Sequence, residues 1–161
     1  MKVLNENEET GCCKRFNPEP WKDKEINFGD RLFMKDHVIS IFHIPLNYGS
    51  VMKRNMEKIE RADAKAIEPL MLSDEHSLWG AEIYIAVEKK VPGCQIVKIP
   101  GNFLSKVFEG PYNKMDKWIK EMNEFVRSKG KETKKLYFFY TTCPACAKAY
   151  GKNYTVLFAE I

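Results

Sequence analysis

The chain has 161 residues, of which 44% are hydrophobic and 30% are charged, a composition typical of one ordinary folded domain. This composition excludes a disordered chain and a collagen-like one. The formal net charge of +4 is small and the basic residues are spread along the chain, so we expect no direct binding to nucleic acid.

The N-terminus indicates where the protein is located. Glutamates occupy positions 6, 8 and 9, where a secretory signal peptide would be apolar. No apolar run approaches the roughly 18 residues of a membrane span. We therefore expect a cytoplasmic protein without membrane contact, in which the five cysteines are reduced. For the oligomeric state, the sequence is compatible with a monomer and with a homodimer.

The first segment of the chain, residues 1–24, is polar and is predicted to form an irregular N-terminal arm. Pro18 and Pro20 are incompatible with a helix there. Phe16 and Trp21 are the side chains expected to attach this arm to a single folded domain over residues 25–161.

The next segment alternates between strand and helix signals. Residues 37–44 are rich in β-branched and aromatic side chains and predict a strand. A helix follows, in which Met52, Met56 and Ile59 recur every three or four residues and form its apolar face. Further strands are expected at 67–72, 81–87 and 94–99, with a loop at 73–77.

The second half of the chain gives the clearest helical pattern. After a predicted strand at 103–108, apolar residues recur at helical spacing: Met115, Trp118, Ile119, Met122, Phe125 and Val126. Gly130 is a suitable terminator, and we assign Trp118 to the core. Strands are then expected at 136–140 and 154–161.

The two halves of the chain share a motif. The pattern Phe-x-x-Pro-x-Asn begins at Phe42 and again at Phe108, and the alignment pairs apolar positions along both predicted helices. This indicates two strand-helix-strand-strand repeats, at about 36–90 and 94–161, although two unrelated amphipathic helices that each follow a proline would give a similar match. The expected fold is α+β, with pseudo-twofold-related repeats forming an antiparallel sheet with two helices.

Glu82 and Tyr84 are the candidate catalytic residues. They lie two positions apart in a predicted strand and therefore share a face of it. The carboxylate of Glu82 could act as a general base on water or pair with a cationic ligand, and Tyr84 could donate to a leaving group or orient the carboxylate. The alternative is that this face is open to solvent and the pair has no role.

Aromatic residues are the candidate walls of a ligand site in a cleft between the repeats. Planar and cationic molecules stack on such rings, although each ring could instead belong to the core. His43 and Glu109 occupy equivalent positions in the two repeats and could face each other across the twofold axis. Together with Glu82 and Tyr84, the predicted ligand-binding set contains Trp79, Tyr112, Phe138, Tyr140, His43 and Glu109.

Cys143 and Cys146 form a C-x-x-C motif, whose spacing is that of a metal knuckle or a dithiol redox pair. A zinc site would need further ligands, for which Cys12 and Cys13 are candidates. The alternative is a structural loop with buried thiols. No other cofactor is expected.

Residues 107–118 carry a resemblance to a known family. A strand, then Gly110, Pro111 and Tyr112, then an amphipathic helix closed by Gly130 resembles the GyrI-like family of gyrase-inhibitory proteins and multidrug effector-binding domains. The resemblance covers roughly residues 30–161. It implies an α+β fold that binds bulky apolar, often cationic, aromatic molecules. One branch of the family is described as hydrolases of cyclopropane-bearing, DNA-alkylating natural products.

The chain differs from this family in two ways, and both change the function that we expect. The residues before position 30 are too few for the DNA-binding domain of the regulators. The hydrolase branch has an E-I-Y-like strand in its second repeat, whereas here residues 136–140 lack a carboxylate and Glu82-Ile83-Tyr84 lies in the first repeat. We therefore expect a stand-alone binding protein for apolar or cationic aromatic small molecules.

Two other functions remain open. The first is a hydrolase of strained electrophilic small molecules, with Glu82 as base and Tyr84 as its partner. The second is a metal-binding or thiol-redox protein that uses Cys143 and Cys146.

Overall fold

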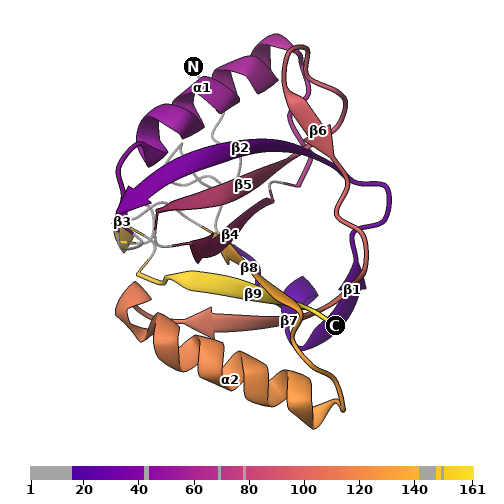
Figure 1. Ribbon diagram of the computed structural model, residues 1–161, viewed down its shortest axis with the longest axis vertical. Coiled ribbons are helices and arrows are strands. Elements are labelled where there is room, and N and C mark those ends of the chain that lie inside the picture. Colours follow the sequence, from indigo (N-terminus) through magenta and orange to yellow (C-terminus); the bar gives the residue numbers. More distant parts are fainter. Residues whose placement is uncertain (1–15, 42–43, 69, 78, 142–147, 150) are drawn as a thin grey trace. The chain divides into compact units, whose positions relative to one another are not determined.

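The structure, a computed structural model, describes residues 16–41, 44–68, 70–77, 79–141, 148–149 and 151–161 (Figure 1). The chain divides into two units. One unit is Asn27–Asn102, and the other combines Met1–Ile26 with Phe103–Ile161. Each unit contains a set of antiparallel strands and one α-helix.

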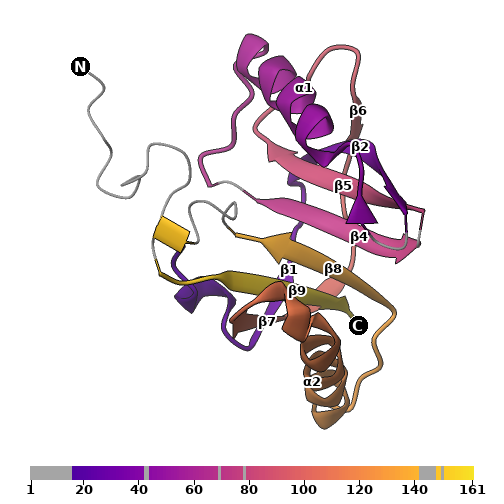
Figure 2. The same cartoon turned by 90° about the vertical axis from the view of Figure 1, so that its left-hand side faces the viewer.

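The unit Asn27–Asn102 is an antiparallel sheet with one long helix on it. β5 lies between β2 and β4, while β3 and β6 pair with β2. The helix α1 covers one face of β2 and β5 (Figures 1 and 2). The elements are β2 (Leu32–Ile41), β3 (Ile44–Pro45), α1 (Tyr48–Arg61), β4 (Met71–Ser77), β5 (Gly80–Val87) and β6 (Gln95–Val97).

The core of this unit follows the two-residue period of its strands. Met34 and Val38 of β2 pack with Ile83 and Ile85 of β5 and with Ile59 of α1. Because neighbouring residues of a strand point to opposite faces, the side chains between these core residues lie on the face away from α1. That second face carries the polar residues considered below as a site.

The inward face of α1 differs from the predicted one. The structure buries Val51, Asn55 and Ile59, whereas Met56 is exposed and Met52 is only partly buried. Hydrophobic periodicity counts asparagine as a solvent-facing residue, so it placed the helix in a rotated register. The Asn55 amide is buried because it has a hydrogen-bond partner on β2.

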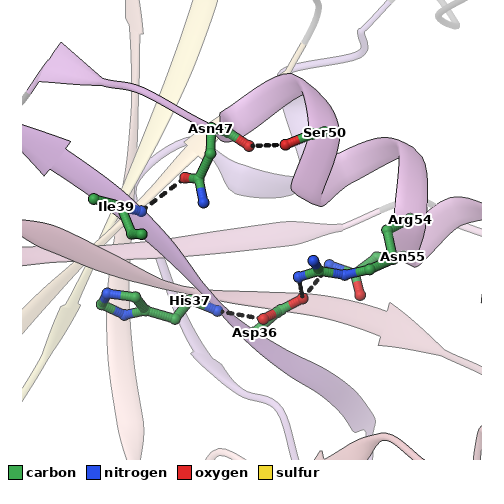
Figure 3. A network of polar contacts seen from close by, with 7 residues as sticks. All are labelled: Asp36, His37, Ile39, Asn47, Ser50, Arg54 and Asn55. Atoms are coloured by element: carbon green, nitrogen blue, oxygen red, sulfur yellow. Dashed lines mark hydrogen bonds and ion pairs between the residues drawn. The ribbon is translucent and has the colours of Figure 1, made fainter.

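That partner is Asp36, whose carboxylate joins α1 to β2 (Figure 3). Its Oδ2 accepts hydrogen bonds from Arg54 Nη2 at 2.8 Å and from Asn55 Nδ2 at 2.9 Å, and its Oδ1 accepts one from the backbone N–H of His37 at 2.7 Å. Burial alone would raise the pKa of Asp36. The hydrogen bonds and the Arg54 charge outweigh burial, and the pKa lies below its ordinary value.

A second contact fixes the start of α1. Asn47 precedes the helix, and its Oδ1 accepts a hydrogen bond from the backbone N–H of Ile39 at 2.8 Å. Its backbone carbonyl accepts one from Ser50 Oγ at 3.0 Å (Figure 3). The first turn and the middle of the helix are thus both bound to β2, which limits how α1 can rotate or slide on the sheet.

The second unit has the same order of elements. β9 lies between β7 and β8 and is antiparallel to both, and β1 lies next to β7. The helix α2 packs on one face of this sheet (Figures 1 and 2). The elements are η1 (Glu19–Trp21), β1 (Lys24–Asn27), β7 (Asn102–Glu109), η2 (Tyr112–Lys114), α2 (Met115–Ser128), β8 (Lys135–Tyr140) and β9 (Tyr154–Glu160).

Trp118 of α2 is buried between the helix and the sheet, which confirms its assignment to the core. Its ring stacks on Phe108 with centroids 5.7 Å apart. On the opposite face of the sheet, Phe16 contacts Phe139 at 6.0 Å between centroids, and Trp21 contacts Phe158 at 5.4 Å. The described part of the N-terminal segment therefore packs against the face that α2 leaves uncovered.

The α+β class is confirmed, because both units combine antiparallel strands with a helix. In each unit a strand (β2 or β7) is followed by a helix and then by two strands (β4 and β5, or β8 and β9), and the second of these two lies between its neighbours. This shared pairing is what a duplication would produce, but descent from one repeat stays a prediction. Within the described ranges no helix is long and apolar enough to cross a membrane.

One predicted element is wrong. Residues 73–77 were expected to form a loop, but they belong to β4, which overlaps the predicted strand 67–72 only at Met71 and Leu72. Ser73 and Asp74 are polar yet buried, and they pair with Ile83 and Glu82 of β5. Pairing with a central strand supplies backbone hydrogen bonds that local polarity does not reveal.

The Asp36 network gives a stability prediction. Asp36→Ala should lower the free energy of unfolding by about 1–3 kcal/mol, because the buried Asn55 amide loses its acceptor. The control is Asp30→Ala, which removes an exposed carboxylate 3.2 Å from Lys98 and should cost about 0–1 kcal/mol. Urea denaturation measures both values. Equal losses in the two variants would contradict the prediction.

The lowered pKa of Asp36 gives a pH prediction. A carboxyl group whose folded pKa lies below its unfolded value, about 3.9, stabilises the fold above that value, and this stabilisation is lost as the pH falls through the folded pKa. The stability difference between wild type and Asp36→Asn should therefore be constant near neutral pH and shrink below about pH 4. Urea denaturation across an acid series measures it, and a difference that grows in acid would refute this assignment.

Candidate functional site

His37 and Glu82 form a polar pair on the face of the β2–β5 sheet away from α1. The register of the two strands places them directly opposite each other, and His37 Nδ1 lies 3.2 Å from Glu82 Oε1. Their side chains are 53% and 30% exposed, so solvent and small molecules reach both. An imidazole held by a carboxylate is an arrangement that proton-transfer sites use.

Two further charged residues, Asp74 and Lys35, and the aromatic residue Tyr84 lie near this pair. Asp74 of β4 is paired with Glu82 from the other side and is buried. Tyr84 follows two residues after Glu82, on the same face, and is also buried. The Nζ atom of Lys35 lies 5.7 Å from the centre of the Tyr84 ring, within range of a cation–π interaction. Glu82 is thus flanked by groups of both charge signs.

Gly80 explains how the imidazole ring is accommodated. A Cβ atom at Gly80 would lie 2.5 Å from Cε1 and 2.7 Å from Nε2 of His37, and 3.1 Å from the carbonyl oxygen of Val38. Side chains essentially never approach so closely, so any residue larger than glycine would displace the ring. The edge of the ring that carries Nε2 therefore lies over the bare backbone of β5.

Exposed apolar side chains border the pair. Ile39 and Ile41 follow His37 at two-residue spacing, so they lie on the same face of β2. Trp79 immediately precedes Gly80 and lies opposite Ser40, whose backbone N–H donates a hydrogen bond to its carbonyl oxygen at 2.9 Å, so Trp79 is out of phase with the face of the pair. Both isoleucine side chains are exposed, which gives the polar pair an apolar border on β2.

The structure places the predicted site residues in both units. Glu82 and Tyr84 share a face of β5, and Trp79 lies at the start of that strand. Phe138 lies in the core under α2, and Tyr140 packs against it with ring centroids 6.4 Å apart. Both positions match the alternative stated from the sequence, that these rings belong to the core. The remaining residue of this unit, Glu109, is exposed at the end of β7.

A ligand cleft shared by the repeats therefore stays a prediction. His43 and the side chain of Tyr112 lie outside the described part of the chain. His37, in contrast, was not among the predicted site residues. Its position in a strand could be read from the sequence, but no local signal identifies a partner 45 positions away.

The metal and redox hypotheses rest on the sequence alone. The four cysteines on which they depend, Cys12, Cys13, Cys143 and Cys146, lie outside the described residues. In the part of the chain that the structure does describe, no group of three or more His, Cys, Asp or Glu residues is placed to hold a metal ion. Cys94 is a half-buried free thiol.

Comparisons with known proteins add a family and a fold. A family model described as "Bacterial hydrolase" matches residues 3–161. The crystal structure of a hydrolase from Listeria innocua is similar to this chain, with a TM-score of 0.59 and 12% sequence identity, over 86% of this chain and 91% of that one. No curated protein matches the sequence. At this identity the structural similarity shows a common fold only.

The close approach of His37 to Gly80 gives a testable coupling. Gly80→Ala should lower the free energy of unfolding by about 0.5–1 kcal/mol, because the methyl group overlaps the imidazole and the half-exposed ring must swing aside. The loss should be smaller in a His37→Ala background, where the ring is gone, and urea denaturation of the four proteins measures the coupling. Gly49→Ala is the control, since a Cβ there meets nothing within 4 Å. Additive effects of the two substitutions would contradict the overlap.

Proposed function

We propose that this chain, which belongs to the bacterial hydrolase family, hydrolyses apolar electrophilic small molecules at the His37–Glu82 pair, on the face of β2 and β5 away from α1. The observation that carries the proposal is the 3.2 Å contact between Glu82 and His37 on that face. Hydrolysis requires a group that removes a proton from water as the water oxygen attacks carbon. An exposed carboxylate paired with an imidazole meets this requirement.

Glu82 is the proposed carboxylate on which removal of this proton depends. Tyr84, two residues along the same face, is its proposed partner and orients the carboxylate. The resemblance of the chain to the GyrI-like family supports strained electrophiles as substrates, since one branch is described as hydrolases of cyclopropane-bearing compounds. Here the Glu-Ile-Tyr sequence that resembles that branch lies on β5.

The apolar border supports a hydrophobic substrate. Ile39 and Ile41 present exposed hydrophobic surface on the same face of β2 as His37, and burying such surface under a ligand is favourable. A small, fully polar substrate would leave this surface uncovered. We therefore propose substrates with an apolar or aromatic body and one electrophilic carbon.

The same apolar border also favours a second candidate, binding without chemistry, which is the function first expected from the sequence. Affinity does not separate the two candidates, because both use the same surface. Turnover does, since only an enzyme makes interactions that are stronger in the transition state than with the bound substrate.

The hydrolase proposal predicts that Glu82→Gln lowers kcat by about 10²–10⁴ with little change in KM. Glutamine keeps the size and hydrogen-bonding reach of glutamate but loses its charge. The measurement is hydrolysis of a panel of strained-ring and activated aryl electrophiles, with release of product followed over time. Glu57→Gln, which changes an exposed glutamate on α1, is the matched control and should retain wild-type rates.

Two outcomes would overturn this proposal. If wild-type protein binds members of the panel with saturation but gives no turnover above buffer, the protein is a binder. If turnover persists in Glu82→Gln, the reacting site lies on other residues.

A further inference from the structure

The geometry points to His37 as the residue that takes the proton from water, with Glu82 acting through it. This inference rests on the proposed hydrolase function and adds to it a residue and the direction of the proton transfer. It follows from which ring nitrogen contacts Glu82, from what lies under the ring, and from the relative exposure of the two side chains.

The first argument is the contact between the two side chains. His37 Nδ1 is the nitrogen that lies 3.2 Å from Glu82 Oε1. An ionised carboxylate only accepts hydrogen bonds, so the neutral imidazole carries its hydrogen on Nδ1 and keeps a lone pair on Nε2. That lone pair makes Nε2 the proton acceptor of the pair. The imidazole is also the more exposed of the two side chains, at 53% against 30%.

The second argument is that the ring is held in place. Gly80 leaves room for the Cε1–Nε2 edge, as the short distances to a hypothetical Cβ show. On the other face of the strand, the Asp36 carboxylate accepts a hydrogen bond from the His37 backbone N–H at 2.7 Å, and Arg54 and Asn55 of α1 hold that carboxylate (Figure 3). The backbone that carries the imidazole is therefore fixed from the helix side.

The proposed step balances in protons and electrons. Nε2 accepts a proton from water while the water oxygen forms a bond to the electrophilic carbon. The bond from that carbon to the leaving group breaks, and its electron pair goes to the leaving group. The imidazolium then returns its proton to the leaving group, and His37 is neutral again. Glu82 keeps its negative charge and stabilises the imidazolium while it exists.

The charges around the pair suit this role. Glu82 on β5 and Asp74 on β4 are acidic and favour the imidazolium, while Lys35 on β2 is basic and opposes it. α1 packs on the opposite face, where Arg54 is bound to Asp36. Glu82 occupies the register position opposite His37, and Asp74 lies opposite Glu82 on the next strand, so the transient positive charge forms on the side of the negative groups.

The test compares two substitutions at the ring with a distant control. His37→Gln keeps a donor towards Glu82 but removes the basic nitrogen, and turnover should fall about 10²–10⁴-fold. Gly80→Ala should also reduce turnover, because the methyl group pushes the ring from its position. Gly49→Ala, a glycine on α1 with open space around it, should leave turnover at the wild-type level.

A second measurement needs no substrate. The chain has three histidines, so nitrogen NMR of histidine-labelled protein can be assigned with a His37→Gln spectrum as reference. The neutral His37 ring should carry its hydrogen on Nδ1 in wild type, and Glu82→Gln should change this tautomer preference.

The outcomes separate the inference from the proposed function. If wild type turns over and His37→Gln stays within a few-fold of it, Glu82 acts on water directly, and the inference is wrong while the hydrolase function stands. A hydrogen found on Nε2 of the neutral ring would also overturn the inference. If wild type shows no turnover, the hydrolase function itself fails, and the inference fails with it.

Discussion

The antiparallel register between β2 and β5 is the constraint on which the rest of this site depends. It sets Met34 and Val38 beside Ile83 and Ile85 under α1, and the same register sets His37 opposite Glu82 on the other face. A slip of one residue would turn the apolar side chains of a strand towards solvent, so burial of the core fixes the register. The hydrophobic effect thereby also fixes the alignment of two polar residues that are not part of the core.

Asp36 connects the two faces of β2. Its carboxylate satisfies Asn55, a polar residue buried in the middle of the helix interface, and it binds the backbone of the residue that carries the proposed base. Such a buried amide would destabilise the fold without an acceptor. Docking of α1 and placement of His37 consequently share one group. A change in how the helix sits on the sheet would be transmitted to the ring through a single backbone hydrogen bond.

For this protein, having the same fold as known proteins does not by itself specify the same reaction. Residues far apart in sequence produce the fold through layers of apolar side chains, and many different sequences satisfy that requirement. The proposed chemistry instead depends on a few positions: a carboxylate, an imidazole and a glycine that leaves space for it. Membership of a hydrolase family agrees with these groups, and their geometry is the basis of the proton transfer that we propose.

The sequence alone determined the elements with strong periodicity, and with them the helix of Trp118 and the common face of Glu82 and Tyr84, since both follow from local spacing. It misplaced β4 and the inward face of α1, where buried Asp74 and Asn55 look like solvent-exposed residues until their partners are known. Only the tertiary structure revealed His37 as part of the site. The alternation of residues along a strand shows which face of the sheet each side chain occupies. The residue opposite it on the next strand depends on long-range pairing, which no local sequence pattern encodes.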